Sequence, residues 1–230
     1  MKKANIAVLL AGCGVYDGSE IHEAVLTLLA ITEAGATYQC IAPDKTQYHT
    51  INHLNGEIEK TNRNVLAEAA RIARGDIKAL GTINFSDYDA LIIPGGFGAA
   101  KNLNQWAIAG PDGDIDTEVQ AIILHFVEAK KPIGAMCMGP TVVAKALAGT
   151  AFHAKLTVGS TVAPSPYDIA GISVGMESLG VQVEMKLITE ISIDPALKIV
   201  SAPCYMMVAD ISEIRNNTKQ LVDAVVRLIA

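Results

Sequence analysis

The stretch Ile133–Pro140 (IGAMCMGP) decides the fold, because an apolar strand ends at Cys137 and a helix begins almost at once. A nucleophile elbow needs small residues two before and two after the nucleophile, since the backbone there is pinched between strand and helix. Ala135 and Gly139 meet that need, and Pro140 suits the first turn of a helix. The stretch therefore predicts a strand–cysteine–helix turn, which is typical of α/β proteins.

Outward from this turn, apolar runs of strand length alternate with amphipathic stretches of helical length. That alternation predicts a mostly parallel sheet covered by helices on both faces. No linker rich in Pro, Gly or Ser interrupts it, so we expect residues 1–230 to form a single doubly wound α/β domain. The predicted strands are 6–10, 37–41, 90–93, 133–136 and short ones near Leu156, Val183 and Ile199; the predicted helices are 17–34, 62–74, 117–129, 139–148 and 208–229, with a hairpin over 49–59.

The composition excludes several classes of function. The net charge is −6 and the only basic runs are pairs, which argues against binding to nucleic acid or to an anionic membrane. No apolar stretch is long enough to span a membrane, and the run 6–10 is too short for a signal peptide. The four cysteines are far apart, which excludes a zinc ribbon and makes a disulfide framework improbable. We therefore expect a reduced, cytoplasmic protein.

Cys137 is the candidate nucleophile. The positive end of the following helix should lower the pKa of its thiol, and no other cysteine of the chain has this setting. A buried, inert cysteine is the alternative, because free cysteines are often buried. The small flanking residues and the helix start favour the functional interpretation.

Two further loops follow predicted strands. Residues 94–100 (PGGFGAA) lack the spacing of a phosphate-binding loop, but they lie at a strand end as Cys137 does. We expect this loop to contribute to an oxyanion hole, with Gly95 and Gly98 as glycines of the substrate loop. Residues 12–23 (GCGVYDGSEIHE) contain Glu20 and Glu23. Glu23 lies deeper in its helix, where partial burial would raise its pKa and suit it to proton transfer, whereas Glu20 complements the helix dipole.

Neither a metal site nor a cofactor is expected. Residues 112–116 (DGDID) resemble the start of a calcium loop, but Thr117 stands where that loop requires glycine and Ile123 where it requires glutamate. The five histidines show no convincing pair of metal ligands.

These motifs give the chain a resemblance to the PfpI-like branch of the class I glutamine amidotransferase-like superfamily, and within it to the ElbB-type isoprenoid-biosynthesis glyoxalases. The resemblance rests on residues 12–24, 51–54, 94–103 and the Met136-Cys137 elbow, and extends from Met1 to the last helix. It implies a flavodoxin-like fold, a nucleophilic Cys137, a helix carboxylate at Glu23, and an oxyanion hole from the N–H groups of Gly96 and Met138. It also implies a homodimer with glyoxalase activity and no added cofactor.

One departure from that superfamily distinguishes between functions. Members commonly place a histidine after the strand that follows the elbow helix, but residues 155–160 (KLTVGS) contain none, and no histidine follows His153. This disfavours a glutaminase, and also a peptidase, because a leaving amine must be protonated. A thiolate and one carboxylate suffice for a small 1,2-dicarbonyl such as glyoxal. The alternative is a non-catalytic redox-sensing or regulatory protein with an oxidisable elbow cysteine.

Overall fold

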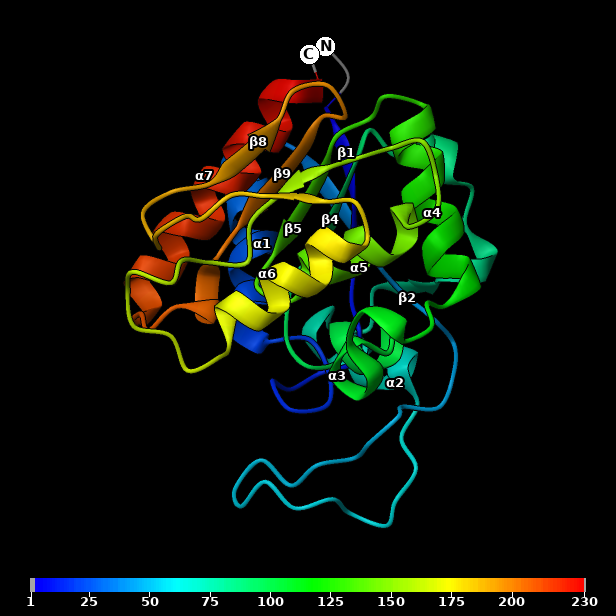
Figure 1. Cartoon of the computed structure of the whole chain (residues 1–230). Helices are drawn as coiled ribbons and strands as arrows, with labels where there is room; N and C mark the ends of the chain where they lie inside the picture. Colours follow the sequence, from blue (N-terminus) through cyan, green and yellow to red (C-terminus); the bar gives the residue numbers. More distant parts are fainter. Residues whose placement is uncertain (1–2, 230) are drawn as a thin grey trace.

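The computed structural model describes residues 3–229 as a layered α/β domain (Figure 1). In the main sheet all neighbouring strands are parallel except β8 (Ser192–Asp194), which runs antiparallel to β9 (Ile199–Ala202) at one edge. A second, two-stranded sheet consists of β6 (Lys155–Leu156) and β7 (Gln182–Val183). The order across the main sheet is β3 (Ile77–Ala79), β2 (Thr37–Ala42), β1 (Asn5–Leu9), β4 (Ala90–Ile93), β5 (Ile133–Met136), β9 (Ile199–Ala202) and β8 (Ser192–Asp194).

Helices cover both faces of the main sheet. Helices α1 (Ile21–Glu33) and α7 (Ile211–Ile229) pack against each other on one face, and α4 (Thr117–Glu128) and α5 (Gly139–Leu147) pack together on the other (Figure 1). The expected flavodoxin-like, doubly wound, mostly parallel architecture is confirmed. The shorter helices are α2 (Val65–Ile72), α3 (Trp106–Ala109) and α6 (Ile169–Ser178), with a π-helical turn at Ala99–Leu103 and 3-10 turns at Leu80–Thr82, Phe85–Asp87, Gly110–Asp112 and Cys204–Met206.

The central strands are apolar because both of their faces are covered. Every residue of β4, β5 and β9 is buried, which explains their uninterrupted apolar character in the sequence. Gly134 shows how closely α7 approaches β5: a Cβ atom on it would lie 2.7 Å from Leu221 Cδ2 and 3.0 Å from Val225 Cγ2. The elbow is thus built on a strand that is buried along its whole length.

The helix predicted over 17–34 begins later, at Ile21, so Asp17 lies outside it and does not cap it. Residues 12–19 instead form a compact loop, in which the Gly14 N–H donates to the Ser19 carbonyl at 2.9 Å. Glu20 is the N-cap, and its carboxylate accepts from the Glu23 N–H at 2.7 Å. Asp17 is buried and accepts from the Ile51 N–H at 2.7 Å, so it binds a neighbouring loop rather than its own helix.

The hairpin expected over 49–59 is reduced to one antiparallel bridge, between Ile51 and Ile58. Figure 1 shows the reason: the segment between β2 and α2 projects from the body of the domain, away from any sheet edge with which it could pair. Strands β3 and β8 and helices α3 and α6 were not predicted. They are short or, in α6, interrupted by Gly171 and Gly175, so they give a weak periodic signal.

Gly134→Val should lower the free energy of unfolding by about 2 kcal/mol, because branched methyl groups would overlap Leu221 and Val225. Gly134→Ala is the graded control, since the far end of the Leu221 side chain can move away from a single methyl group. Urea denaturation measures both. Equal stability of the valine variant and the wild type would contradict the close packing of α7 on β5.

Candidate active site

Cys137 occupies a strained turn at the end of β5. Its φ is +55°, in the left-handed region that side chains with a Cβ rarely adopt, and its N–H donates to the Ala202 carbonyl at 3.0 Å. Small residues are required around it, because a Cβ on Gly139 would lie 2.7 Å from the Ile93 carbonyl oxygen. The predicted elbow geometry is therefore confirmed. The side chain is almost enclosed, with 4% of the residue exposed.

Glu23 lies in the first turn of α1 and is fully buried beside Cys137. Its Oε2 accepts from the Gly95 N–H at 2.9 Å, and its Oε1 accepts from the Tyr205 N–H at 3.2 Å. Gly95 packs against both functional groups: a Cβ on it would lie 2.7 Å from Glu23 Oε2 and 2.8 Å from Cys137 Sγ. The carboxyl group of Glu23 and the thiol of Cys137 therefore both lie against Gly95, and a side chain at this position would collide with them.

Burial controls the protonation of this pair. Desolvation, followed by repulsion from Glu20, raises the pKa of Glu23 to about 8, although the N–H groups of Tyr205 and Gly95 act in the opposite direction. Burial and then the Glu23 charge also raise the pKa of the Cys137 thiol, against a lowering contribution from the Gly96 N–H. At neutral pH the carboxyl is therefore mainly protonated.

The expected lowering of the Cys137 pKa is wrong. The helix N-terminus is present, but desolvation and the adjacent acid outweigh it. Burial also raises the pKa of the other three thiols, Cys13, Cys40 and Cys204. What distinguishes Cys137 is its contact with a carboxyl group that can exchange a proton with it.

The glycine loop 94–98 lies across the loop 12–19. Gly96 has φ +92°, and a Cβ on it would lie 2.4 Å from both the Glu20 nitrogen and the Gly18 carbonyl oxygen. A substitution at Gly96 would therefore displace this loop. Gly98 packs on Gly18, to whose carbonyl its N–H donates at 2.8 Å, so it supports the loop and does not face Cys137.

The structure brings together Cys137, Glu23, Gly95 and Gly96, with Met138 next to them at the start of α5. The histidines lie elsewhere: His22 Nδ1 is 2.8 Å from the Tyr205 hydroxyl, and His153 lies against Gly180. In the described part of the chain the arrangement is a Cys–Glu pair and not a Cys–His pair. Nor do three or more His, Cys, Asp or Glu side chains within residues 3–229 gather in a way that could hold a metal ion.

Two tyrosines of the site were missed by the sequence analysis. Tyr205 follows β9 and binds Glu23 through its backbone N–H. Burial, followed by the proximity of Cys137 and Glu23, raises the pKa of Tyr167 to about 12, so its phenol stays protonated. Both residues lie more than 140 positions from Glu23 in the chain, and no local motif marks them.

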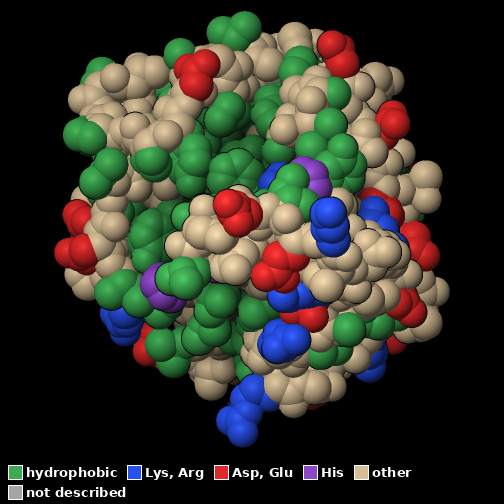
Figure 2. Space-filling view, turned by 90° about the horizontal axis from the view of Figure 1, so that it is seen from below, with side chains coloured by type: hydrophobic (Ala, Val, Ile, Leu, Met, Phe, Trp, Pro, Cys, Tyr) green, Lys and Arg blue, Asp and Glu red, His purple; other side chains and the backbone are tan. Residues whose placement is uncertain are grey.

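Two cavities meet at Tyr16 and Tyr167, on the face at the carboxyl ends of the parallel strands. Figure 2 views the molecule from this side, where hydrophobic side chains gather between scattered charged ones. One cavity has a volume of about 360 Å³ and the other about 410 Å³. The first is lined mainly by Val15, Tyr16, Glu20, His22, Tyr167 and Tyr205, with Pro166 and 207–209, and the second by Tyr16, Ile51, Gly56, Phe97, Lys101 and Tyr167.

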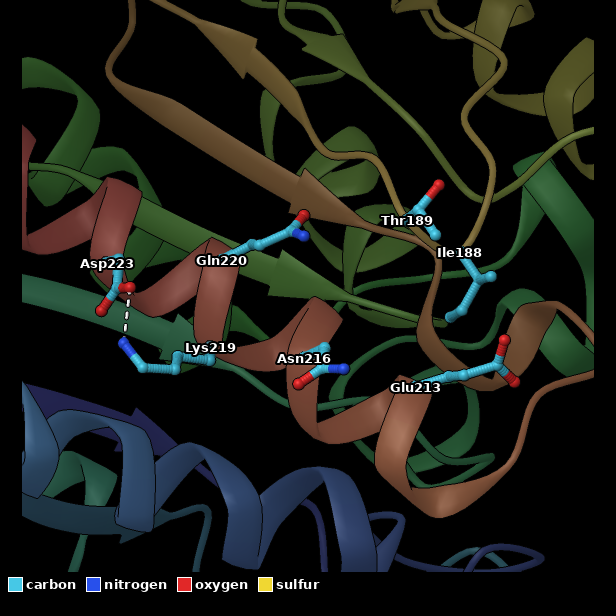
Figure 3. Close-up of a pocket in the computed structure, with 7 residues that line it drawn as sticks. All are labelled: Ile188, Thr189, Glu213, Asn216, Lys219, Gln220 and Asp223. Atoms are coloured by element: carbon cyan, nitrogen blue, oxygen red, sulfur yellow. Dashed lines mark hydrogen bonds and ion pairs between the residues drawn. The ribbon is translucent and has the colours of Figure 1, made fainter.

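The groove in Figure 3 is separate from this site. It lies along α7 and the residues Ile188 and Thr189, and it contains the Lys219–Asp223 ion pair at 2.6 Å. None of the site residues lines it, so we assign it no part in the chemistry.

One side chain connects the loops around the mouth of the site. Asn102 is buried, and its Nδ2 donates to the carbonyls of Ala11 and Asp17 at 2.8 and 2.9 Å. Its Oδ1 accepts from the Tyr48 N–H at 2.9 Å. The π-helical turn, the loop 12–19 and the projecting segment are thus joined at one residue.

Comparison with known proteins identifies relatives of the whole chain. Residues 7–189 match the DJ-1/PfpI family. The chain is 41% identical over 230 residues to the mitochondrial ES1 protein homolog of Rattus norvegicus, covering 98% of this chain and 84% of that protein. It is 40% identical to the mitochondrial glutamine amidotransferase-like class 1 domain-containing protein 3 of Homo sapiens, covering 98% and 83%. The crystal structure of an isoprenoid biosynthesis protein with an amidotransferase-like domain from Ehrlichia chaffeensis superimposes with a TM-score of 0.86 at 32% identity, covering 97% of this chain and 99% of that one.

The curated relatives bear on cellular location. Both are named as mitochondrial proteins, which does not fit the plain cytoplasmic location expected from the sequence. Among residues 3–229, none of the helices combines the length and the hydrophobicity that crossing a membrane requires.

Glu23→Gln should change the pH dependence of stability. The pKa of Glu23 rises from an ordinary value near 4.5 to about 8 on folding, so its stabilising contribution is complete below pH 4.5 and is lost as the pH rises toward 8. The free energy of unfolding of the wild type should therefore fall relative to that of the variant, by at most about 1.4 kcal/mol per pH unit over this window.

Urea denaturation at pH 5, 6, 7 and 8 measures this difference. The slope with pH is the relevant quantity, because the glutamine NH₂ would face the N–H of Gly95 or Tyr205 and cost stability at every pH. Glu128→Gln, on the exposed side of α4, is the control. Parallel curves for Glu23→Gln and the wild type would contradict the raised pKa.

Proposed function

We propose that this chain, which belongs to the DJ-1/PfpI family, is a cofactor-independent glyoxalase of the ElbB type, acting on a small 1,2-dicarbonyl such as glyoxal. The family includes glyoxalases, deglycases and redox-sensing proteins, and cysteine-dependent enzymes of several kinds. The observation that carries the proposal is the Cys137–Glu23 pair, in which a buried thiol adjoins a carboxyl group with a pKa of about 8. Such a group can accept and donate a proton near neutral pH.

The reaction begins with addition of the Cys137 sulfur to one aldehyde carbon. A C–S bond forms, the carbonyl π electrons move to oxygen, and the thiol proton ends on that oxygen, which gives a hemithioacetal. The Gly96 N–H, directed at the sulfur, and the neighbouring Met138 N–H are the groups we assign to the developing oxyanion. Gly95 holds Glu23 in position through its N–H.

Glu23 then transfers the proton between the two carbons. Its carboxylate removes the hydrogen from the sulfur-bearing carbon, which gives an enediol, and its protonated form returns a proton to the neighbouring carbon. The product is a thioester of the 2-hydroxy acid on Cys137. Water hydrolyses it, so glyoxal and one water give glycolic acid and the free thiol. No step requires an oxidant, a reductant or a leaving amine.

Glu23→Gln should lower turnover of glyoxal by a factor of roughly 10²–10⁴, because an amide cannot shuttle the proton. Glu20→Gln is the matched control: it keeps the acceptor that caps α1 and should retain most of the activity. Turnover is measured as glycolate formed by purified protein, with Cys137→Ser as the inactive reference. Normal turnover by Glu23→Gln would remove Glu23 from the mechanism.

A redox-sensing role is the second candidate, and the same pair favours it. A protonated Glu23 and the Gly96 N–H both adjoin the sulfur, where they could stabilise the oxygens of an oxidised cysteine. Mass spectrometry after peroxide treatment distinguishes the two functions. Selective addition of two oxygens to Cys137, in a protein that does not turn over glyoxal or methylglyoxal, would replace the glyoxalase proposal with this one.

We also propose a homodimer, as the family resemblance implies. A monomer of 24.2 kDa and a dimer of twice that mass are readily separated by light scattering. A monomeric mass at micromolar concentration would contradict the dimer.

A further inference from the structure

The cavity of about 410 Å³ beside the candidate active site contains a single cationic group. Its walls are the rings of Tyr16, Phe97 and Tyr167 together with Ile51 and Gly56, and Lys101 is the one charged residue among those that line it within residues 3–229. The neighbouring cavity has the opposite character, because Glu20 and His22 line it. The mouth of the site is therefore polarised, with its positive side at Lys101.

Lys101 is held in this cavity without a carboxylate partner. Its Nζ donates to the Tyr16 carbonyl at 3.0 Å and lies 5.3 Å from the centroid of the Phe97 ring. Within residues 3–229, no carboxylate oxygen lies within 4 Å of this Nζ. The carboxylate of Asp17 is engaged elsewhere, accepting from the Ile51 N–H at 2.7 Å and lying 3.8 Å from His53 Nε2. An ammonium group has three N–H donors, so two remain for a ligand.

Part of the Lys101 side chain is buried, so its charge is less completely hydrated than that of a surface lysine. Burial lowers the pKa of Lys101, and the negative charge of Asp17 acts in the opposite direction. An anionic group in the cavity would supply a counter-charge in direct contact with Lys101 and acceptors for its two free N–H groups.

Tyr167 connects this cavity to the reacting groups. It lines both cavities, and its phenol is close enough to Cys137 and Glu23 for each to raise its pKa. Phe97 directly follows Gly95 and Gly96 in the chain and contacts Tyr167, with ring centroids 5.9 Å apart. The residues that line this cavity are therefore direct neighbours of the groups around Cys137.

We propose that Lys101 binds the anionic end of the substrate, a carboxylate or a phosphate. The preferred substrate is then a small 2-oxoaldehyde that carries such an anionic group, and not an uncharged dicarbonyl. This inference rests on the proposed function for the identity of the reacting carbonyl. The anion site itself is tested separately from turnover.

Alkylation of Cys137 by iodoacetate and by iodoacetamide provides that test. The two reagents have the same size and the same leaving group, and they differ in charge. Peptide mass spectrometry gives the rate at Cys137 for each. Lys101→Met should lower the ratio of the iodoacetate rate to the iodoacetamide rate about fivefold or more, because one positive charge is lost near the reaction path. The iodoacetamide rate should stay within about twofold.

Two variants control this measurement. Lys101→Arg keeps the charge and should retain most of the ratio. Lys45→Met removes one positive charge from a lysine that is already paired with Asp116 at 2.6 Å, and it should leave the ratio unchanged. If Lys101→Met slows both reagents equally, Lys101 acts by holding the loop at Tyr16, and the anion site is wrong. If Lys45→Met lowers the ratio as much, the effect is one of overall charge, which also overturns the proposal.

Protection experiments distinguish the two anions. Glycolate and inorganic phosphate are each added while iodoacetamide alkylates Cys137, and the anion that binds at Lys101 should slow the reaction in the wild type but not in Lys101→Met. Protection by neither at millimolar concentration would contradict the site. For turnover, KM for 3-phosphooxy-2-oxopropanal should rise about fivefold or more in Lys101→Met, while KM for methylglyoxal stays constant. Absence of turnover with every dicarbonyl would refute the proposed function and leave the alkylation result valid.

Discussion

The hydrogen bonds that hold the Glu23 carboxyl group are the constraint on which the candidate site depends. One oxygen accepts from Gly95 after β4 and the other from Tyr205 after β9, while Cys137 ends β5 between them. Three neighbouring strands therefore converge on one side chain that comes from a helix. A carboxyl group buried so completely is tolerated only because backbone donors occupy both of its oxygens.

This constraint also explains the local sequence. Gly95 is required because any Cβ would enter the contact between carboxyl and thiol, and Gly139 because the helix must start close to β4. Cys137 adopts a left-handed backbone conformation at the point where the chain reverses from strand to helix. The two glycines and the strained backbone of Cys137 thus have a common cause: the carboxyl group of Glu23, on a helix, must contact the sulfur of Cys137, at a strand end.

The sequence was sufficient for the parts of the protein that local pattern determines. The elbow around Cys137 and the burial of Glu23 were predictable, because small residues and apolar periodicity mark them. The pKa of Cys137 was not, because the helix N-terminus is a local feature whereas desolvation depends on the whole fold. Tyr205 was missed for the same reason, since its contact with Glu23 spans 182 residues. Gly98 was assigned to the substrate because its motif is local, while its packing on Gly18 is not.

The position of Asn102 has a consequence for how this part of the molecule can change over evolution. Its amide bonds three segments that are distant in the sequence, and each of those bonds is to backbone, so the partners can vary in side chain without loss of the connection. The segments can therefore exchange residues freely, but a change of length or path next to a bonded residue would break its bond to Asn102. Diversification of the rim is expected to proceed by substitution within fixed loop lengths, with insertions confined to the tip of the projecting segment.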